Sequence, residues 1–500
     1  MATLGTLLDS PITWRHAATN PEVKAFLEDL QANILKGHGR QHSGHIFLSF
    51  AGMTPKDVAA LIRTLGQHCT TAYKQLRANK KLPPYIDGGP VRCLLLSSSG
   101  YRALGDGVQV PKGDAFKAGM EARQSILGDP ARADWNAVGW RKSAPDALFL
   151  VANANPQSVT ADLEAMEGWL NGTGASILVV ERGLQQTRSF RPGKPEGVEH
   201  FGYVDGRSQP LFLTEDIDAE NTPVDPAGTL PSQKKHWSPI FKPSQFIVPD
   251  VNGTTKFAAG SFFVFRKLDQ NVRGFNAAET ALGKAYFGKG ANDEQLDRAG
   301  AMVVGRFEDG TPLTLFPKEQ KTAVTNDFTY AGDADAEKCP FHAHIRKVNP
   351  RGDIERLVGA EDEGPGRIRI MARRGITYGA LRPHNADQSE FADAGSEPEQ
   401  DVGLLFMAYM ASIEEQFEFT QQSWANSPAF AGNIAGGANP ATGIDPIIGQ
   451  PKGNAGREHT FKDGWTGGAA KKLTFAQFVT MQGGEYFFAP SIGFLRSVGL

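Results

Sequence analysis

Short apolar runs alternate with longer, mixed segments through the first part of the chain. The apolar runs have the length of buried strands, and the segments between them are long enough for helices. Thr54 belongs to a residue type that caps helix N-termini, so a helix is expected to follow it. The predicted order is strand, helix, strand, strand, helix, strand, formed by residues 45–50, 54–69, 91–96, 147–152, 158–170 and 176–181.

The second half of the chain repeats this order of elements in pattern, although not in letters. Residues 367–372 alternate charged and apolar side chains, as a half-buried strand does, whereas residues 404–411 are apolar throughout, as a buried strand is. The pattern therefore predicts an α+β fold of two halves, each an antiparallel sheet covered by helices. The other expected elements of this half are a strand at 261–265 and helices at 277–287 and 412–424.

An irregular lead-in with one helix, at 21–34, is expected before the two halves. Stretches rich in Gly, Pro, Asn and Asp separate many of the elements, and long loops inside a compact domain often build a site. We expect the boundary between the halves to fall between Gly206 and Ser261. The predicted organisation is a lead-in over 1–40, an N-terminal domain over 41–215 and a C-terminal domain over 216–500.

The composition is that of a globular protein with a site for a small molecule. Of the 500 residues, 40% are hydrophobic and 21% are charged, which excludes a wholly disordered chain. The 52 basic and 55 acidic side chains leave a net charge of −3, so no strong field attracts nucleic acid or an anionic membrane. We therefore expect neither nucleic acid nor a membrane as a partner.

The cysteines and the N-terminal segment bear on the cellular compartment. Cys69, Cys93 and Cys339 form neither a disulfide framework nor a paired zinc motif. The N-terminus lacks a basic start followed by a sustained apolar stretch, and the longest apolar run, 404–411, is far too short to span a membrane. A cytoplasmic protein is expected, although a secreted protein whose signal has been removed would show the same sequence.

Asp205 stands next to a glycine in the segment Gly-Tyr-Val-Asp-Gly, residues 202–206. Asp-Gly is a common turn dipeptide, so an ordinary turn accounts for the motif. A carboxylate held at a tight bend between two glycines can also be buried and can serve as an acid–base group. Asp205 is therefore a candidate for proton transfer, on a motif that is weak alone.

Two histidines, His342 and His344, lie two residues apart in the segment Cys-Pro-Phe-His-Ala-His-Ile-Arg-Lys. On a strand both would reach the same metal, whereas on a helix they point apart and only one can be a ligand. Histidine is the usual axial ligand of haem iron in peroxidases, and Arg346 and Lys347 are cations of the kind that haem propionates need. The alternative interpretation is one exposed histidine and one structural histidine.

Arg373 and Arg374 follow one another at the end of the strand expected at 367–372. Two adjacent arginines at a strand end are ordinarily surface charges. In the functional interpretation one guanidinium points into a pocket, where it stays charged and stabilises a developing anion. The apolar run 404–411 is core by default, and it would supply a dry wall if one of its faces lined that pocket.

Taken together and in this order, four segments resemble the dye-decolourising peroxidase family. They are Glu-His-Phe-Gly-Tyr-Val-Asp-Gly-Arg-Ser-Gln-Pro from Glu199, His-Ala-His-Ile-Arg-Lys-Val-Asn-Pro-Arg from His342, Arg-Arg-Gly-Ile-Thr-Tyr-Gly from Arg373, and Leu-Leu-Phe-Met-Ala-Tyr from Leu404. Three flanking segments resemble further landmarks of the family: Gln-Ala-Asn-Ile-Leu-Lys-Gly-His-Gly-Arg from Gln31, Ser-Phe-Phe-Val-Phe-Arg-Lys-Leu from Ser261, and Asp-Pro-Ile-Ile-Gly-Gln from Asp445. The resemblance runs from about residue 30 to near the C-terminus, and the loops resemble those of the longer bacterial and fungal branches.

The resemblance implies two ferredoxin-like halves, with a haem between the sheet and the helices of the C-terminal half. The family's Gly-x-x-Asp-Gly motif falls on Gly202, Asp205 and Gly206, which implies Asp205 as the distal carboxylate. The distal arginine is implied at Arg373, with Arg374 pointing elsewhere. These two side chains would act on the peroxide side of the haem.

On the opposite side, the resemblance implies His344 as the iron ligand of a haem b, because the family pattern His-x-Arg falls on His344 and Arg346. His342 is then a bystander. The ligand is usually hydrogen-bonded to an acid, and Glu414, with Glu415 as the alternative, is expected in that role. Arg346 is expected to bind a propionate. The remaining residues expected at the haem are Gly206, Leu404 and Phe406.

The implied activity is that of a peroxidase, which reduces hydrogen peroxide and oxidises phenolic, anthraquinone or azo dye-like compounds in one-electron steps. Asp205, or a water it holds, is expected to move a proton between the peroxide oxygens while Arg373 stabilises the charge. The arginine would keep the pKa of Asp205 down, so activity on dyes is expected to peak in acid. Trp424 and Tyr330 are candidates for surface radicals that serve bulky dyes, and packing is the alternative role for Trp424.

Two other functions compete with this one. A non-haem metal site at His342 and His344 would need a third ligand, such as His200 or His384, and no motif of that kind is seen. A haem-binding protein without turnover would be recognised by a lost distal pair, and both members of that pair are present in the sequence.

Overall fold

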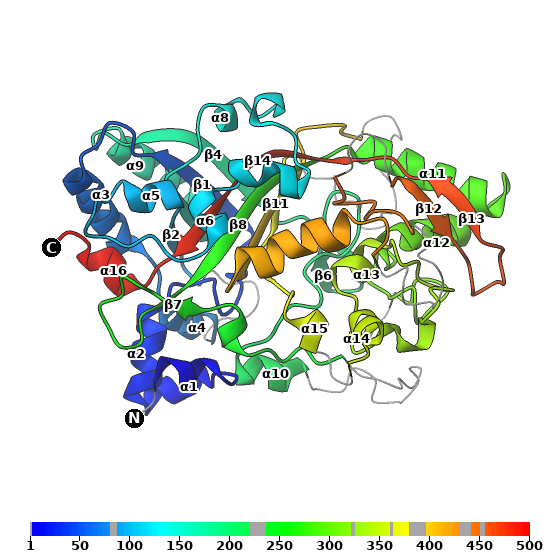
Figure 1. The fold of residues 1–500 in the computed structure, drawn as a ribbon, viewed down its shortest axis with the longest axis horizontal. Coiled ribbons are helices and arrows are strands. Elements are labelled where there is room, and N and C mark those ends of the chain that lie inside the picture. Colours follow the sequence, from blue (N-terminus) through cyan, green and yellow to red (C-terminus); the bar gives the residue numbers. More distant parts are fainter. Residues whose placement is uncertain are drawn as a thin grey trace.

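The structure is a computed structural model that describes residues 3–80, 88–220, 237–321, 326–360, 364–379, 397–430, 442–450 and 456–500. Its centre is a ten-stranded sheet whose paired strands are all antiparallel. The main path of the sheet runs β10-β11-β8-β14-β2-β3-β1-β4, so the two halves of the chain each supply four neighbouring strands. They join where Phe488 of β14 is opposite Leu96 of β2. Figure 1 shows the N-terminal half at one end of the long axis and helices α11 and α12 at the other.

The N-terminal half has the strand and helix order that the sequence predicts. Thr54 caps the first long helix by accepting a hydrogen bond from the backbone N–H of Asp57, 3.2 Å away. Strand order β2-β3-β1-β4, with two helices between strands, is that of a ferredoxin-like unit. The elements are β1 (His42–Ser49), α3 (Pro55–His68), β2 (Val91–Leu96), β3 (Ala147–Asn153), α9 (Pro156–Leu170) and β4 (Ser176–Leu184).

The C-terminal half repeats this topology, as expected, with strand order β10-β11-β8-β14. The helix expected at 412–424 is present but π-helical, in two segments at Ile413–Glu418 and Thr420–Ala425, and π-helical turns frequently occur at functional sites. The predicted α+β fold of two ferredoxin-like halves is therefore confirmed. The elements are β8 (Ala259–Gln270), α11 (Val272–Phe287), α12 (Asp293–Val304), β9 (Ala372–Arg373), β10 (Ile376–Tyr378), β11 (Gly403–Met410) and β14 (Val479–Ala489).

One expectation for this half is wrong, and strand β14 was not predicted. Residues 367–372 do not form a strand: Arg367 ends helix α15 (Gly364–Arg367), Ile368 is 49% exposed, and pairing with β11 begins only at Ala372. The alternation of charged and apolar residues there belongs to the last residue of α15 and the turn that follows it. Strand β14 was not expected at all, because Gly483 and Gly484 interrupt its apolar pattern at a β-bulge.

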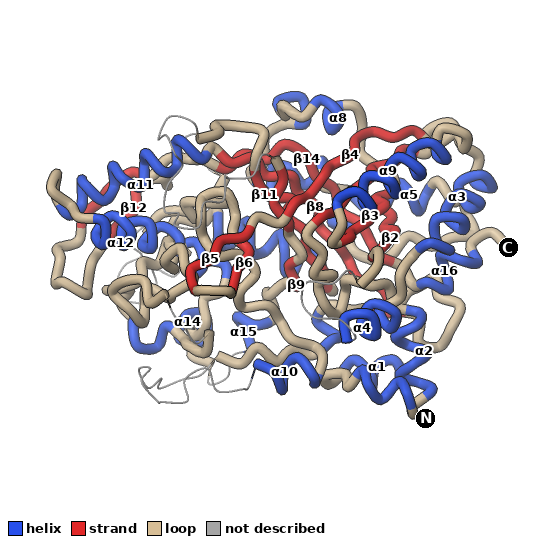
Figure 2. The backbone as a smooth tube through the Cα atoms, turned by 180° about the vertical axis from the view of Figure 1, so that it is seen from behind, coloured by secondary structure: helices blue, strands red, loops and turns tan. Residues whose placement is uncertain are grey.

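Smaller elements fill the loops, and the lead-in helix expected at 21–34 is shorter than predicted. Helix α16 (Ile492–Ser497), near the C-terminus, lies beside α3 of the N-terminal half, as Figure 2 shows. None of the described helices is both long and apolar enough to span a bilayer. The other elements are α1 (Leu4–Leu8), α2 (Pro21–Asp29), α4 (Ala72–Lys80), α5 (Ser98–Arg102), α6 (Asp114–Ala118), α7 (Gln124–Leu127), α8 (Val138–Arg141), β5 (Thr187–Arg191), β6 (Lys194–Gly197), α10 (Thr214–Glu220), β7 (Val248–Pro249), α13 (His344–Val348), α14 (Asp353–Val358), β12 (Glu458–Phe461) and β13 (Lys471–Thr474).

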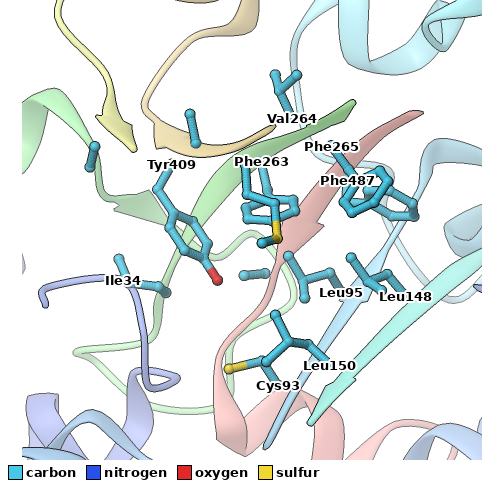
Figure 3. Close-up of a cluster of buried hydrophobic side chains, with 14 of the residues drawn as sticks. Ile34, Cys93, Leu95, Leu148, Leu150, Phe263, Val264, Phe265, Tyr409 and Phe487 are labelled. Carbon is cyan, nitrogen blue, oxygen red and sulfur yellow. The ribbon is translucent and has the colours of Figure 1, made fainter. Parts of the chain in front are cut away.

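Alternate residues of β8 serve two different purposes. Phe263 and Phe265 enter the main core, where the ring of Phe265 lies 4.7 Å from that of Phe47 in the other half. Figure 3 shows this cluster, in which Phe487 and Leu148 also take part. Because successive side chains of a strand point to opposite faces, Arg266 and Leu268, further along β8, face the other way. That second face of β8 and β11 is the floor of a cavity.

Candidate active site

A cavity of about 780 Å³ lies against this second face of the sheet. Its size falls in the range of small-molecule and cofactor pockets, roughly 300–1,000 Å³. Leu268 of β8 and its cross-strand partner Leu404 of β11 lie on its floor, and residues of helix α13 and of the two π-helical segments also line the cavity. Residues of the N-terminal segment 33–40 and of the loop 199–212 complete the wall. Both halves of the chain therefore build the cavity.

Asp205 lies in this cavity at a backbone turn that only its neighbouring glycines allow. Gly202 and Gly206 have φ of +107° and +85°, the left-handed region that glycine tolerates best. The Asp205 backbone N–H donates to the carbonyl of Gly197, and its Oδ1 accepts from the N–H of Gly206 at 2.6 Å. The side chain is 38% exposed, so the motif is a turn that also presents a carboxylate to the cavity.

Arg373 also lies in the cavity, and its Nη1 is 3.9 Å from Oδ1 of Asp205. The guanidinium is fixed by a hydrogen bond from Nη2 to the carbonyl of Arg207 at 2.6 Å. Arg374 is held differently, because it donates to the backbone carbonyls of Asn33 and Ile34 at 2.8 Å each. Arg374 thus binds the N-terminal segment, whereas Arg373 lies beside the Asp205 carboxylate.

His344 is the first residue of helix α13 and faces the cavity, with 22% of its side chain exposed. Its Nδ1 lies 2.8 Å from Oδ2 of Asp445, which is fully buried. A carboxylate only accepts, so Nδ1 carries the proton, and Nε2 is left as the nitrogen available to a metal. This is the arrangement of a metal-binding histidine whose ring is oriented by an acid.

Backbone hydrogen bonds stabilise the Asp445 carboxylate that contacts His344. Its second carboxylate oxygen, Oδ1, accepts from the N–H groups of Ile447 at 2.8 Å and Ile448 at 3.0 Å. Burial by itself would raise the pKa of the Asp445 carboxyl, but the electrostatic interaction and hydrogen bond with the adjacent imidazole of His344 and these two backbone donors outweigh it, so the pKa lies below its ordinary value. Asp445 therefore stays an anion beside the imidazole.

The prediction that Glu414 or Glu415 is the acid hydrogen-bonded to His344 is wrong. Glu414 accepts from the backbone N–H of Ala115 at 2.7 Å, and Glu415 is an exposed partner of Arg369. Both glutamates follow the end of β11, which made them candidates by position along the chain. Asp445 is the first residue of the Asp-Pro-Ile-Ile-Gly-Gln segment, which resembles the family but whose residues were assigned no role from the sequence.

The expected role of Arg346 at a propionate is also wrong. Its side chain is 1% exposed and lies outside the cavity lining. Nε donates to Asp353 at 2.7 Å and Nη1 to Asp333 at 3.1 Å, so two buried carboxylates already neutralise it. Arg346 therefore links the segments around the His344 helix, and its guanidinium is not available to bind an external anion.

Arg306 is the cation that the sequence did not single out. It lies in the cavity lining, is 3% exposed, and donates to the carbonyl of Gly310 and the side chain of Asn326, while no carboxylate of the described residues pairs with it. Burial, with the nearby charges of Arg207 and Arg373, lowers the pKa of Arg306 to about 10. A buried cation without a counter-ion favours an acidic group bound beside it. Its segment, Val-Gly-Arg-Phe, carries no pattern that would have revealed this.

The alternative of a non-haem site at both histidines does not fit. His342 precedes the helix, is buried against the rings of His459 and Phe461 at 4.7 Å each, and does not line the cavity. His200 hydrogen-bonds the carbonyl of Tyr378 at 2.8 Å, and His384 lies outside the described residues. Among the residues that are described, no group of three or more His, Cys, Asp or Glu side chains could hold a metal ion.

Apolar side chains form most of the remaining wall. Leu404, Phe406 and Gly206 all line the cavity, in which they are expected from the sequence. The two candidates for surface radicals are placed differently, because Trp424 is 3% exposed and Tyr330 is 1% exposed. Both are packed in the interior, so neither is a surface residue. The other apolar residues of the wall include Leu268, Ile345, Val348, Phe417, Ile447 and Ile448.

These features define the class of the protein. A histidine oriented by an acid, an apolar wall, a buried cation, and a separate carboxylate–arginine pair fit a haem-binding oxidoreductase. The residues of the cavity fit the group in both chemistry and size, since they offer one nitrogen ligand, a dry wall and a counter-ion for a propionate.

The comparisons with known proteins agree with this class. The chain is 39% identical over 500 residues to the multifunctional dye peroxidase DyP2 of Amycolatopsis sp., with 98% of this chain and 99% of that protein covered. The solved structure of DyP2 superimposes with a TM-score of 0.84 at 37% identity, and the DyP-type peroxidase of Anabaena sp. with 0.82 at 35%, covering 98% of this chain each and 99% and 97% of theirs. No family model matches the sequence. The chain belongs to the dye-decolorizing peroxidases, which are haem enzymes.

Proposed function

We propose that this chain binds haem b through His344 and uses hydrogen peroxide to oxidise phenolic and dye-like aromatic compounds by one-electron steps. The observation that carries the proposal is one cavity lined by His344, with Asp445 behind it, and by the Asp205–Arg373 pair. When bound, the haem would supply the redox chemistry that couples reduction of peroxide to one-electron oxidation of the reductant. Relatives of the chain are named for action on dyes, and one is solved with 2,6-dimethoxyphenol.

Asp205 is the group that moves the proton. It is the carboxylate that the Gly206 N–H and the turn hold at a fixed place in the cavity, and 38% of its side chain remains accessible. It can take a proton from one peroxide oxygen and return it to the other, directly or through a water. General acid–base catalysis of this kind contributes about 10²–10⁴-fold to a rate.

Arg373 stabilises the negative charge that develops on the peroxide while the proton moves. Its guanidinium is already oriented by the Arg207 carbonyl and the Asp205 carboxylate, so little reorganisation is needed during the reaction. Because both members of this pair are in the cavity, catalysis is favoured over a haem-handling role without turnover.

His344, Arg306 and the apolar wall hold the cofactor. His344 would bind the iron through Nε2, because Nδ1 is committed to Asp445. Arg306 would pair with a propionate, since no carboxylate of the described residues pairs with its buried guanidinium. Leu404 and Phe406 would keep water away from the reacting side.

The experiment is an absorption spectrum of the purified, haem-reconstituted protein beside His344→Ala, with His68→Ala as a control at an exposed histidine of the N-terminal half. We expect a Soret band in the wild type and in His68→Ala, a greatly reduced band in His344→Ala, and a shift of the wild-type band with one equivalent of peroxide. A wild-type protein that stays colourless with haem supplied, or a full Soret band in His344→Ala, would contradict the proposal.

A further inference from the structure

A third histidine lies directly behind the His344–Asp445 pair. His459 belongs to strand β12, is fully buried, and has its Nε2 2.9 Å from the carbonyl oxygen of Ile444, the residue before Asp445. A carbonyl only accepts, so the proton of His459 sits on Nε2 and the ring donates. Burial lowers the pKa of His459 to about 4, which keeps the ring neutral at ordinary pH.

The peptide unit that leads into Asp445 is thereby held at both of its polar ends. Its C=O, from Ile444, accepts from His459, and its N–H, from Asp445, donates to the carbonyl of Ala425 at 2.8 Å. A peptide unit is planar, so two such bonds on opposite sides fix its rotation. The direction in which the Asp445 side chain leaves the backbone is fixed with it.

The loop and the ring of His459 are also in close contact. Gly443 has φ of +99°, and a Cβ built there would lie 2.4 Å from Cδ2 of His459. On its other side the ring packs against His342, two residues before the iron ligand, with 4.7 Å between ring centroids. His459 therefore links two parts of the site: it contacts the loop that leads into Asp445 and, through His342, the segment that carries His344.

We propose that His459 is a positioning residue for the iron ligand: its hydrogen bond to Ile444 holds the Asp445 carboxylate against Nδ1 of His344. The strength of that contact determines how much negative charge the imidazole carries, and this charge lowers the reduction potential of the bound iron. The inference rests on the proposed function, because it takes His344 as the ligand. It assigns part of the tuning of the iron to the β12–β13 hairpin.

The test compares three substitutions at His459 in the haem-loaded protein. His459→Gln keeps an N–H donor near the place of Nε2, whereas His459→Phe keeps the ring shape without the donor and His459→Asn has a donor that is too short to reach. A matched control is His45→Phe, since His45 is another buried imidazole bonded to a carbonyl, that of Glu181, in the N-terminal half. Asp445→Asn shows in which direction each measured property changes when the negative charge beside His344 is lost.

The readouts are the ferric–ferrous midpoint potential and the iron–histidine stretching frequency of the ferrous protein. We expect His459→Phe and His459→Asn to raise the potential and lower the frequency, in the direction of Asp445→Asn but by less. His459→Gln and His45→Phe should stay close to the wild type. If His459→Phe does not fold, the comparison of the two amides decides.

Two results would overturn the inference. Wild-type potential and frequency in the donor-free variants would show that the hydrogen bond does not matter, and equal shifts in His459→Gln and His459→Asn would show that only the shape of the ring does. A wild-type protein without an iron–histidine band would instead refute the proposed ligand, so the two failures are distinguishable.

Discussion

Nδ1 of His344 lies 2.8 Å from Oδ2 of Asp445, although the two residues are 101 positions apart in the chain. The contact decides which ring nitrogen is free, since a carboxylate accepts and cannot donate. It also places a full negative charge in the protein interior, next to the only group in the cavity that is oriented as an iron ligand among the described residues. The chemistry of the cavity follows from this pair and from the carboxylate–arginine pair elsewhere on the wall.

Replacing Asp445 by Asn should weaken the binding of haem without abolishing it. Loss of such a supporting acid typically costs about 10–100-fold in metal affinity or activity, because the ligand ring loses its orientation and its tautomer. Titration of the apoprotein with haem, followed at the Soret band, measures the change. Glu414→Gln is the control, and a loss of affinity there equal to that of Asp445→Asn would restore Glu414 as the supporting acid.

Replacing Asp205 by Asn should slow the reaction with peroxide by about 10²–10⁴-fold, because the amide cannot carry the proton. Stopped-flow absorption under pseudo-first-order conditions gives the second-order rate constant. Asp216→Asn is a matched control, since Asp216 also lines the cavity but pairs with Lys36 at 2.5 Å. Equal losses in the two variants would show that cavity charge, and not proton transfer, is responsible.

Arg306→Gln should impair haem binding, whereas Arg346→Gln should lower the stability of the fold. Arg306→Gln should weaken haem binding and leave the unfolding of the apoprotein nearly unchanged, because the guanidinium has no carboxylate partner among the described residues. Arg346→Gln leaves Asp333 without an ion-pair partner among the described residues and leaves Asp353 paired with Arg356 alone, and breaking a buried pair costs about 3–5 kcal/mol. Chemical denaturation and haem titration of both variants measure these effects, and the reverse pattern would return the propionate role to Arg346.

Glu279 should make the folded protein less stable as the pH rises through neutrality. Its side chain is partly buried and accepts from the hydroxyl of Tyr203, and the loss of hydration at the carboxyl, followed by the charge of Glu308, raises its pKa from 4.5 to about 8. Between these values the unfolded chain releases a proton that the folded chain keeps, so stability is full below about pH 4.5 and falls up to about pH 8.

The measurement for this residue is the melting temperature of Glu279→Gln against the wild type from pH 4.5 to pH 8. The variant carries no titrating group, so its advantage over the wild type should grow steadily with pH. Glu294→Gln, at a side chain that is 48% exposed, should show no such trend. A constant difference between Glu279→Gln and the wild type at all pH values would contradict the assignment.

Much of the fold could be read from local pattern. Buried strands such as β3 are short apolar runs between polar segments, and Thr54 caps its helix as its residue type suggests. The pattern failed where a tertiary contact overrode it. Strand β14 contains Gly483 and Gly484 and is held by ten residue pairings with β8, so partner strands stabilise a segment whose own letters do not predict a strand.

The same division runs through the site. The sequence by itself determined which residues can carry chemistry: Asp205 between its neighbouring glycines, His344 before an arginine, and Arg373 at the edge of a strand. The tertiary structure decided which of them meet: it brought Asp445, and not Glu414, to His344, and it placed Arg306, and not Arg346, in the cavity wall. The reason is physical: residue type and spacing fix local conformation, whereas a hydrogen bond between distant segments depends on how the whole chain packs, which no local pattern encodes.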